Sequence, residues 1–313
     1  MSVDMTVDLE STFLGGMLGS ALGDAIGEMA FSGPGETELR SKIGQMDELV
    51  YTDDTAMAIG VAESLIQKGD LEPQHLGDTF RVNFRREPWR GYASGPPTIF
   101  ALVERHGMSY TEAARSLFGG LGSLGNGAAM RVVPIGLFFY GNSDLYEKAR
   151  TSAAVTHAHP IGIDGAAVLA RAVAQAVGLS PQEPFPIEQF LHGVMEFART
   201  PTIRDKVVHV GTLVADGVPP SEAAARLGRS VAVHESMPYA LYSFLRHPTS
   251  YEACLFCAIM HGGDRDTLGA MACAISGAYL GVEAIPLLWR RKCENHDYIE
   301  ALARTLAEMK TRG

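Results

Sequence analysis

The sequence predicts an all-α fold, a single compact orthogonal bundle of many helices in which residues 1–313 form one domain. Apolar residues recur every three or four positions over most of the chain, which is the period of an amphipathic helix. Runs with the alternating period of a strand are almost absent. The chain also lacks a linker rich in Ser, Gly or Pro, so one domain is expected rather than two.

Turn signals divide the periodic segments into individual helices. We predict helices near residues 10–29, 53–68, 73–85, 96–106, 110–117, 126–139, 143–156, 160–178, 187–199, 203–216, 220–227, 237–246, 250–260, 266–282 and 296–311.

Composition excludes several classes of protein. The formal net charge is −10 and the 26 Lys and Arg are scattered, so no basic run is present that would follow a nucleic-acid backbone. The apolar stretch 13–31 contains Asp24 and Glu28, and its uncharged part is too short to cross a bilayer. No basic segment typical of a secretory signal precedes it. We expect a cytoplasmic monomer that binds neither nucleic acid nor a membrane.

Glycine spacing predicts a close contact between two helices. Gly15, Gly19, Gly23 and Gly27 recur every fourth residue of the first helix, and Gly269, Cys273, Gly277 and Gly281 do the same in the helix at 266–282. Glycine inside a helix costs about 1 kcal/mol relative to alanine, so a row of glycines on one face needs a compensating contact. We infer that the two helices cross near the centre of the fold. This crossing would bring Asp24 and Glu28 toward the start of the later helix.

Two helix starts carry paired acids with a neighbouring hydroxyl. One is the segment 51–55, Tyr-Thr-Asp-Asp-Thr, and the other is the segment 261–267, His-Gly-Gly-Asp-Arg-Asp-Thr. Helix capping explains one acid at such a position, but a second acid on the same turn adds repulsion that water or a cation must offset. Oxygen ligands without His or Cys favour Mg²⁺, with Mn²⁺ as the alternative. Asp53, Asp54, Asp264 and Asp266 could balance two such ions at the centre of the bundle.

Two further motifs allow more than one interpretation. The segment 118–127 has five glycines in ten residues before a predicted helix, so its N–H groups could bind a phosphate, although a flexible loop fits equally well. It lacks the features of a Rossmann loop and of a P-loop. Cys254 and Cys257 have the spacing of half a zinc site, but no second pair follows, and buried free thiols are the simpler interpretation.

At these motifs the sequence resembles the ADP-ribosylglycohydrolase family. The matching segments occur in the family's order, cover nearly the whole chain and form a specific set. They are 22–27 (Leu-Gly-Asp-Ala-Ile-Gly), 51–58, 90–92, 125–132 (Gly-Asn-Gly-Ala-Ala-Met-Arg-Val), 156–158 and 262–267. Residues 235–245 and 277–289 are most similar to the branch that cleaves serine-linked ADP-ribose, ADP-ribose polymers and O-acetyl-ADP-ribose.

The resemblance implies an all-α enzyme with two Mg²⁺ ions and an ADP-ribose site. The positions that match its metal ligands are Thr52, Asp53, Asp54, Asp264, Asp266 and Thr267. The positions that match its ADP-ribose contacts are Gly95, Phe118, Gly122, Ser123, Leu124, Gly125, Asn126 and His157. Phe118 could stack on adenine. Without the resemblance, His157 would be interpreted as a core histidine.

Three positions depart from the serine-type pattern. Phe31 stands where that branch has a glutamate, Leu124 stands where it has an aromatic residue, and Arg265 separates two acids where a small residue is common. Glu28, one helical turn after Asp24, is the nearest replacement for the missing acid, and Glu36 is a weaker candidate. Asp24 is expected to support the metal ligands rather than to bind metal itself.

The expected activity is metal-dependent hydrolysis of the bond between ADP-ribose and an acceptor, on an ADP-ribosylated protein or an ADP-ribose derivative. Glu28 is the candidate proton-handling acid, with Asp53 or Asp266 as substitutes. The alternatives are hydrolysis of an arginine N-glycosidic link, an ADP-ribose binder inactivated by Phe31, and a purely structural protein. The four site acids argue against the last alternative.

Overall fold

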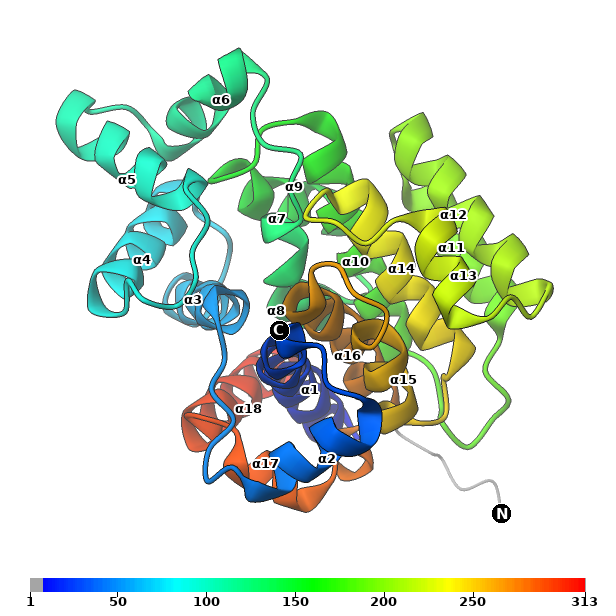
Figure 1. Cartoon of the computed structure of the whole chain (residues 1–313). Coiled ribbons are helices and arrows are strands. Elements are labelled where there is room, and N and C mark those ends of the chain that lie inside the picture. The colour runs from blue at the N-terminus through cyan, green and yellow to red at the C-terminus, as the bar shows by residue number, and fades with distance from the viewer. Residues whose placement is uncertain (1–7, 313) are drawn as a thin grey trace.

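The computed structural model describes residues 8–312, and this part of the chain is all-α (Figure 1). Within it no β-strand forms, and only isolated bridges pair Leu49 with Cys293 and Gly125 with Ala232. The apolar residues of helices from α1 to α18 join one contiguous hydrophobic cluster. The all-α prediction is therefore confirmed.

The helices have the following bounds: α1 Leu9–Met29, α2 Glu36–Gln45, α3 Asp53–Lys68, α4 Pro73–Arg86, α5 Gly95–His106, α6 Tyr110–Gly120, α7 Gly127–Met130, α8 Val133–Phe138, α9 Leu145–Ala154, α10 Pro160–Val177, α11 Ile187–Phe197, α12 Pro201–Ala215, α13 Pro220–Leu227, α14 Val233–Arg246, α15 Tyr251–Ile259, α16 Arg265–Leu280, α17 Leu287–Lys292 and α18 His296–Arg312. Short 3-10 turns lie at Ala30–Ser32 and Val282–Ala284.

Two predicted helices differ from the observed ones, and two observed helices were not predicted. The segment 126–139 divides into α7 and α8, and Pro134, which lacks an N–H donor, lies in the first turn of α8. Helix α14 begins four residues before the predicted 237 and contains Pro238 in its interior. The short helices α2 and α17 were not predicted, because α2 buries only Leu39 and Ile43 and α17 buries only Trp289.

Helix α10 has the length and hydropathy of a membrane-spanning segment. However, 72% of its 18-residue window is buried inside the protein, where it packs against other helices. This burial is typical of a central helix in a globular fold.

The predicted crossing of α1 and α16 is confirmed, and the two helices lie side by side at the centre of the molecule (Figure 1). A Cβ added to Gly15 would lie 2.3 Å from the carbonyl oxygen of Gly277. A Cβ added to Gly23 would lie 2.2 Å from the carbonyl oxygen of Gly269. Because glycines remove the Cβ atoms of α1 along this face and of α16 at Gly269 and Gly277, the two backbones are in van der Waals contact. The antiparallel pairing sets the C-terminal turn of α1 against the N-terminal turn of α16.

The crossing predicts that Gly23→Ala strongly destabilises the protein. The new methyl group would overlap the backbone of Gly269, which cannot rotate away as a side chain could. We expect a loss of about 3 kcal/mol or more in the free energy of unfolding, as overpacking of a rigid core produces. Urea denaturation followed by circular dichroism measures this loss.

Gly44→Ala in α2 is the matched control, because nothing lies within 4 Å of its added Cβ. Alanine in that open helical position should stabilise the protein by about 0.5–1 kcal/mol. Equal effects of the two substitutions would contradict a close crossing at Gly23.

Candidate active site

Asp24 connects the crossed helices to the start of α3. Its carboxylate, fully buried in α1, accepts hydrogen bonds from the backbone N–H and hydroxyl groups of Thr52 and Thr55, at 2.6–3.1 Å. Thr52 is also the N-cap of α3 and accepts from the N–H of Asp54. The four donors fix the first turn of α3 against α1, so the direction of its two acids is set by α1.

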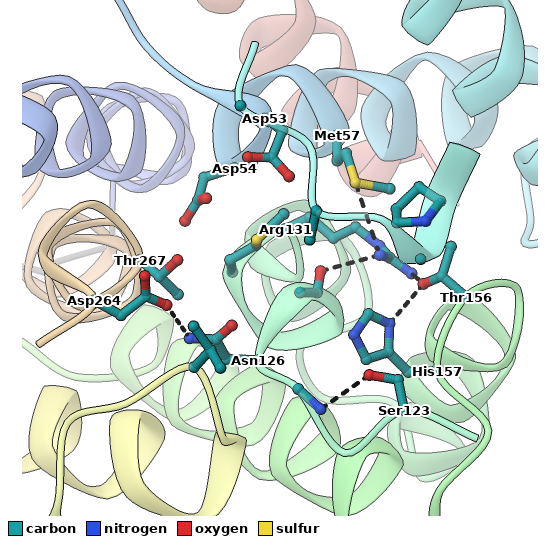
Figure 2. A pocket seen from close by; sticks show the side chains of 18 of the residues that line it. Asp53, Asp54, Met57, Ser123, Asn126, Arg131, Thr156, His157, Asp264 and Thr267 are labelled. Atoms are coloured by element: carbon teal, nitrogen blue, oxygen red, sulfur yellow. Dashed lines mark hydrogen bonds between the residues drawn. The ribbon is translucent and has the colours of Figure 1, made fainter. Parts of the chain in front are cut away.

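Two acidic turns, far apart in the sequence, meet at one cavity of about 340 Å³ (Figure 2). Asp53 and Asp54 reach it from the start of α3, while Asp264 and Asp266 reach it from the start of α16. The hydroxyl residue Thr267 lines the same wall. The spatial condition on which the sequence interpretation depends is therefore met.

Burial and repulsion by neighbouring carboxylates disfavour ionisation of Asp53, Asp54 and Asp266. Burial is the largest cause in each case, followed by neighbouring carboxylates. The pKa of Asp53 rises to about 7, with Asp24 as the next cause, and the pKa of Asp266 rises to about 8, with Asp264 as the next cause. The pKa of Asp54 lies well above its usual range, where Asp266 adds to the effect of burial. The pKa of Asp24 rises to about 6 by burial, although its hydrogen bonds with Thr55 and Thr52 oppose the rise.

The oxygen atoms available as ligands at the acidic end fit a hard cation. Asp54 Oδ1 is buried without a hydrogen-bond partner, although a buried carboxylate oxygen normally has one. The other potential ligands around it are carboxylate and hydroxyl oxygens, which Mg²⁺ and Mn²⁺ prefer. Across residues 8–312, however, no group of three or more His, Cys, Asp or Glu side chains is arranged to hold an ion. The predicted two-metal centre therefore stays a prediction.

The other end of the cavity is formed by the glycine-rich segment and His157. The backbone of Leu117, Phe118 and Gly119 departs from helical geometry at the end of α6, and Phe118 has a positive φ of 52° with its ring 63% exposed. Gly122 lies against residue 158, where an added Cβ would be 2.7 Å from the Cβ of Ala158. Ser123, Gly125 and Asn126 follow along the cavity wall. Residues 122–127 of this segment pack against His157 and its neighbours, whereas nothing lies within 4 Å of an added Cβ at Gly119 or Gly120, so the choice between a phosphate-binding segment and a flexible loop stays open.

Asn126 joins the two ends of the cavity. Its side-chain N–H donates to Asp264 Oδ2 at 2.6 Å and lies 3.2 Å from the Ser236 hydroxyl oxygen (Figure 2). Its backbone N–H donates to the carbonyl oxygen of Val231. The glycine-rich segment is thereby held at a fixed distance from the acid that opens α16.

The predicted site residues do not all reach the cavity surface. Thr52 contacts Asp24 and Asp54 from behind the wall, and Gly122 and Leu124 are not among the lining residues. Glu28 is exposed and also lies outside the lining, although it is close enough to Asp266 to raise the pKa of that acid. Its assignment as the catalytic acid stays a prediction. The remaining predicted residues line the cavity: Asp53, Asp54, Gly95, Phe118, Ser123, Gly125, Asn126, His157, Asp264, Asp266 and Thr267.

Several lining residues were not assigned a role from the sequence. Arg131 and Thr156 belong to segments that resemble the family, but only the structure shows that they line the cavity. The signal for Arg131 was its position as a lone charge in the apolar run 128–139. The other unassigned lining residues are Met57, Gly91, Ala93, Ser94, Pro96, Gly127, Met130 and Val231.

The sequence profile of the ADP-ribosylglycohydrolase family matches residues 5–313. The chain belongs to the ADP-ribosylglycohydrolase family. The chain is therefore a member of a family of ADP-ribosyl hydrolases. The family implies ADP-ribosylated substrates.

Individual relatives agree with this family assignment. The chain is 36% identical to ADP-ribosylhydrolase ARH3 of Mus musculus, with 83% of this chain and 77% of that protein covered. It is 34% identical to the Homo sapiens protein of the same name, with 83% and 79% covered. The ADP-ribosyl-[dinitrogen reductase] glycohydrolase of Rhodospirillum rubrum is 28% identical, with 82% and 76% covered. A solved ADP-ribosylglycohydrolase-related protein complex superposes with a TM-score of 0.73 at 25% identity, covering 97% of this chain and 99% of that one.

The clustered acids predict that the metal-free protein loses stability as the pH rises from about 4 to about 8. Asp53 and Asp266 have higher pKa values when folded than their ordinary value of 3.8, so the folded state binds more protons in this range. Stability that depends on bound protons falls as they dissociate. Urea unfolding at several pH values, in buffer treated with a chelator, measures the slope.

Asp54→Asn is the comparison variant, because it removes one of the repelling charges without changing the shape of the side chain. Its stability should fall less steeply with pH. A wild-type protein that becomes more stable across this range would contradict the described electrostatics.

Proposed function

We propose that this chain is a divalent-metal-dependent hydrolase that cleaves the glycosidic bond between ADP-ribose and an acceptor. The acceptor oxygen would belong to a serine, to an ADP-ribose polymer or to O-acetyl-ADP-ribose. The observation that carries this proposal is the meeting of the α3 and α16 acids at one end of a cavity whose other end is a glycine-rich segment. Acids alone would fit many metal enzymes, but this second wall suits a nucleotide.

The residues that would hold two Mg²⁺ ions, with Mn²⁺ as the alternative, are those of the two acidic turns. Bound there, the ions would supply Lewis-acid polarisation of ribose oxygens and lower the pKa of water. The proposed ligands are Thr52, Asp53, Asp54, Asp264, Asp266 and Thr267. Asp24 positions this set through its bonds to Thr52 and Thr55, and Asn126 orients Asp264.

The glycine-rich end would bind the nucleotide. The exposed ring of Phe118 is available to stack on adenine, and the N–H groups that follow can donate to phosphate oxygens. The proposed ADP-ribose contacts are Gly95, Phe118, Gly122, Ser123, Leu124, Gly125, Asn126 and His157. This arrangement would direct the distal ribose toward the acids. There, water would attack the anomeric carbon and the bond to the acceptor oxygen would break.

Proton transfer would be handled by acids at this end. Without bound cations, burial and neighbouring carboxylates raise the pKa of Asp53 to about 7 and that of Asp266 to about 8, and bound cations would oppose both rises by favouring the ionised form. Glu28 lies on the exposed side of the C-terminal turn of α1, near Asp266, from where it could reach the leaving oxygen of a large acceptor. The acid that protonates the leaving group is therefore proposed among Glu28, Asp53 and Asp266.

Two alternatives are retained. Hydrolysis of an arginine-linked ADP-ribose uses the same reacting carbon, but residues 235–245 and 277–289, which resemble the serine-type branch, favour an oxygen link. A binding protein without catalysis is favoured by one observation, namely Phe31, which is 49% exposed and occupies the position of the serine-type glutamate. The two alternatives differ in their measurable products.

Turnover of defined substrates tests the proposal. Serine-linked, arginine-linked and O-acetyl-linked ADP-ribose would each be incubated with the protein in Mg²⁺, Mn²⁺ and EDTA, with release of ADP-ribose followed by chromatography. We expect release from the oxygen-linked substrates with either ion and none in EDTA. Release confined to the arginine-linked peptide would identify the first alternative. ADP-ribose binding without any release would identify the second.

Glu28→Gln tests the proposed catalytic acid. Removing a general acid or base typically lowers the rate about 100-fold or more, so we expect kcat to fall by this order while ADP-ribose binding is preserved. Steady-state kinetics and calorimetric titration with ADP-ribose separate the two quantities. Glu36→Gln, at the start of α2, tests the weaker candidate for the missing acid and should leave kcat unchanged if Glu28 is the catalytic acid. An unaltered rate in Glu28→Gln would assign proton transfer to the aspartates.

A further inference from the structure

Arg131 is a buried cation that lines the cavity and that the proposed mechanism does not use. Its side chain is fully buried, and in the described part of the chain no carboxylate forms an ion pair with it. Its guanidinium lies 4.8 Å from the centre of the Phe80 ring and donates to the carbonyl oxygens of Gly127 and Ser152, each at 3.0 Å. A buried charge without an ion pair is costly, so a specific role for it is expected.

The guanidinium begins a chain of hydrogen bonds that ends at His157. Arg131 Nη2 lies 2.8 Å from the hydroxyl oxygen of Thr156, and that oxygen lies 2.7 Å from His157 Nδ1 (Figure 2). A guanidinium can only donate, so Thr156 accepts from Arg131 and its own hydrogen remains available. The only other short contact of this buried hydroxyl in the described structure is with Nδ1. The hydroxyl can therefore donate to Nδ1.

The opposite arrangement leaves a buried donor unpaired. If Nδ1 carried the hydrogen, it would donate to the Thr156 oxygen, and the threonine hydrogen would point toward no acceptor. Such an unpaired buried group is unfavourable. Burial, with a smaller effect of Arg131, lowers the pKa of His157 to about 3, so the ring is neutral and carries one hydrogen.

We propose that Arg131 and Thr156 are positioning residues that hold neutral His157 in the Nε2–H tautomer, so that it presents a hydrogen-bond donor to an oxygen of the cavity ligand. Within residues 8–312, the hydrogen bond of the His157 ring is made by Nδ1, and no protein group is hydrogen-bonded to Nε2. This atom lies beside the glycine-rich segment, 3.5 Å and 3.2 Å from the positions that a Cβ would take at Gly125 and Gly127. The absence of side chains at both glycines keeps the space next to Nε2 open for the ligand.

The same guanidinium also fixes the segment that faces His157. Because Arg131 donates to the carbonyl oxygen of Gly127 as well as to Thr156, the distance between the glycine-rich segment and the imidazole is set by one rigid group. Lysine could not reproduce this geometry. The planar guanidinium of arginine directs N–H groups at three separate acceptors, whereas the ammonium group of lysine is a single point. The identity of the ligand as ADP-ribose rests on the proposed function, but the tautomer does not.

A direct test is the ¹⁵N spectrum of the histidine rings in the ligand-free protein. The signals of His157 are assigned by their loss in His157→Gln. We expect Nε2 to show the shift of a protonated nitrogen and Nδ1 that of an unprotonated one. Thr156→Val should abolish this pattern and yield a mixture of tautomers, whereas Thr156→Ser should retain it. A wild-type ring protonated at Nδ1, or an unchanged tautomer in Thr156→Val, would overturn the proposal.

The matched control is another hydroxyl–imidazole pair in the same fold. Ser64 Oγ lies 2.8 Å from His75 Nδ1, away from the residues that line the cavity. Ser64→Ala should alter the ring signals of His75 and leave those of His157 unchanged. A response of His157 to Ser64→Ala would show that its tautomer reports general loosening rather than the Arg131–Thr156 chain.

Ligand affinity gives an independent readout. In calorimetric titrations with ADP-ribose and Mg²⁺, Thr156→Val should weaken binding about tenfold, the order expected for one lost hydrogen bond in a closed site, and Thr156→Ser should restore it. Unchanged affinity in Thr156→Val would remove ligand positioning from the proposal. If the wild-type protein binds no ADP-ribose, the proposed function fails, while the spectrum still decides the tautomer.

Discussion

The direct backbone contact between α1 and α16 is the constraint on which the rest of the site depends. The backbone of α1 can approach α16 this closely because α1 has no Cβ along the contact, which is why glycine recurs every fourth residue in α1. The contact fixes the end of α1 against the start of α16. Asp24 then transfers this position to α3 through four hydrogen bonds with Thr52 and Thr55. Three segments distant in sequence are thereby held in one rigid frame.

That frame brings together groups that would not associate by themselves. Asp53 and Asp266 both repel Asp54, and burial together with neighbouring carboxylates raises the pKa values of all three acids above the usual range. Their proximity costs free energy that the packing of the helix crossing must offset. Such local instability within a stable scaffold is typical of functional sites, where charge is arranged for a ligand rather than for folding.

The two ends of the cavity are organised by different physical means. At the acidic end the side chains have too few partners, and Asp54 Oδ1 has none. At the glycine-rich end the polar groups are connected in chains, from Arg131 through Thr156 to His157 and from Asn126 to Asp264. The first end thus has buried acids whose charge the proposed cations would balance, while the second presents fixed donors. This difference suits a ligand that combines a nucleotide with a ribose to be cleaved.

The sequence by itself determined the all-α class, most helix bounds, the α1–α16 crossing and the membership of Asp53, Asp54, Asp264 and Asp266 in one site. These features are encoded by local periodicity and by short motifs, which need no knowledge of distant contacts. It did not reveal α2 and α17, because each buries very few side chains. Only the tertiary structure decided that Glu28 and Leu124 lie outside the cavity lining and that Arg131 and Thr156 lie within it. The reason is that helix packing decides which way a side chain faces, and this depends on partners more than a hundred residues away.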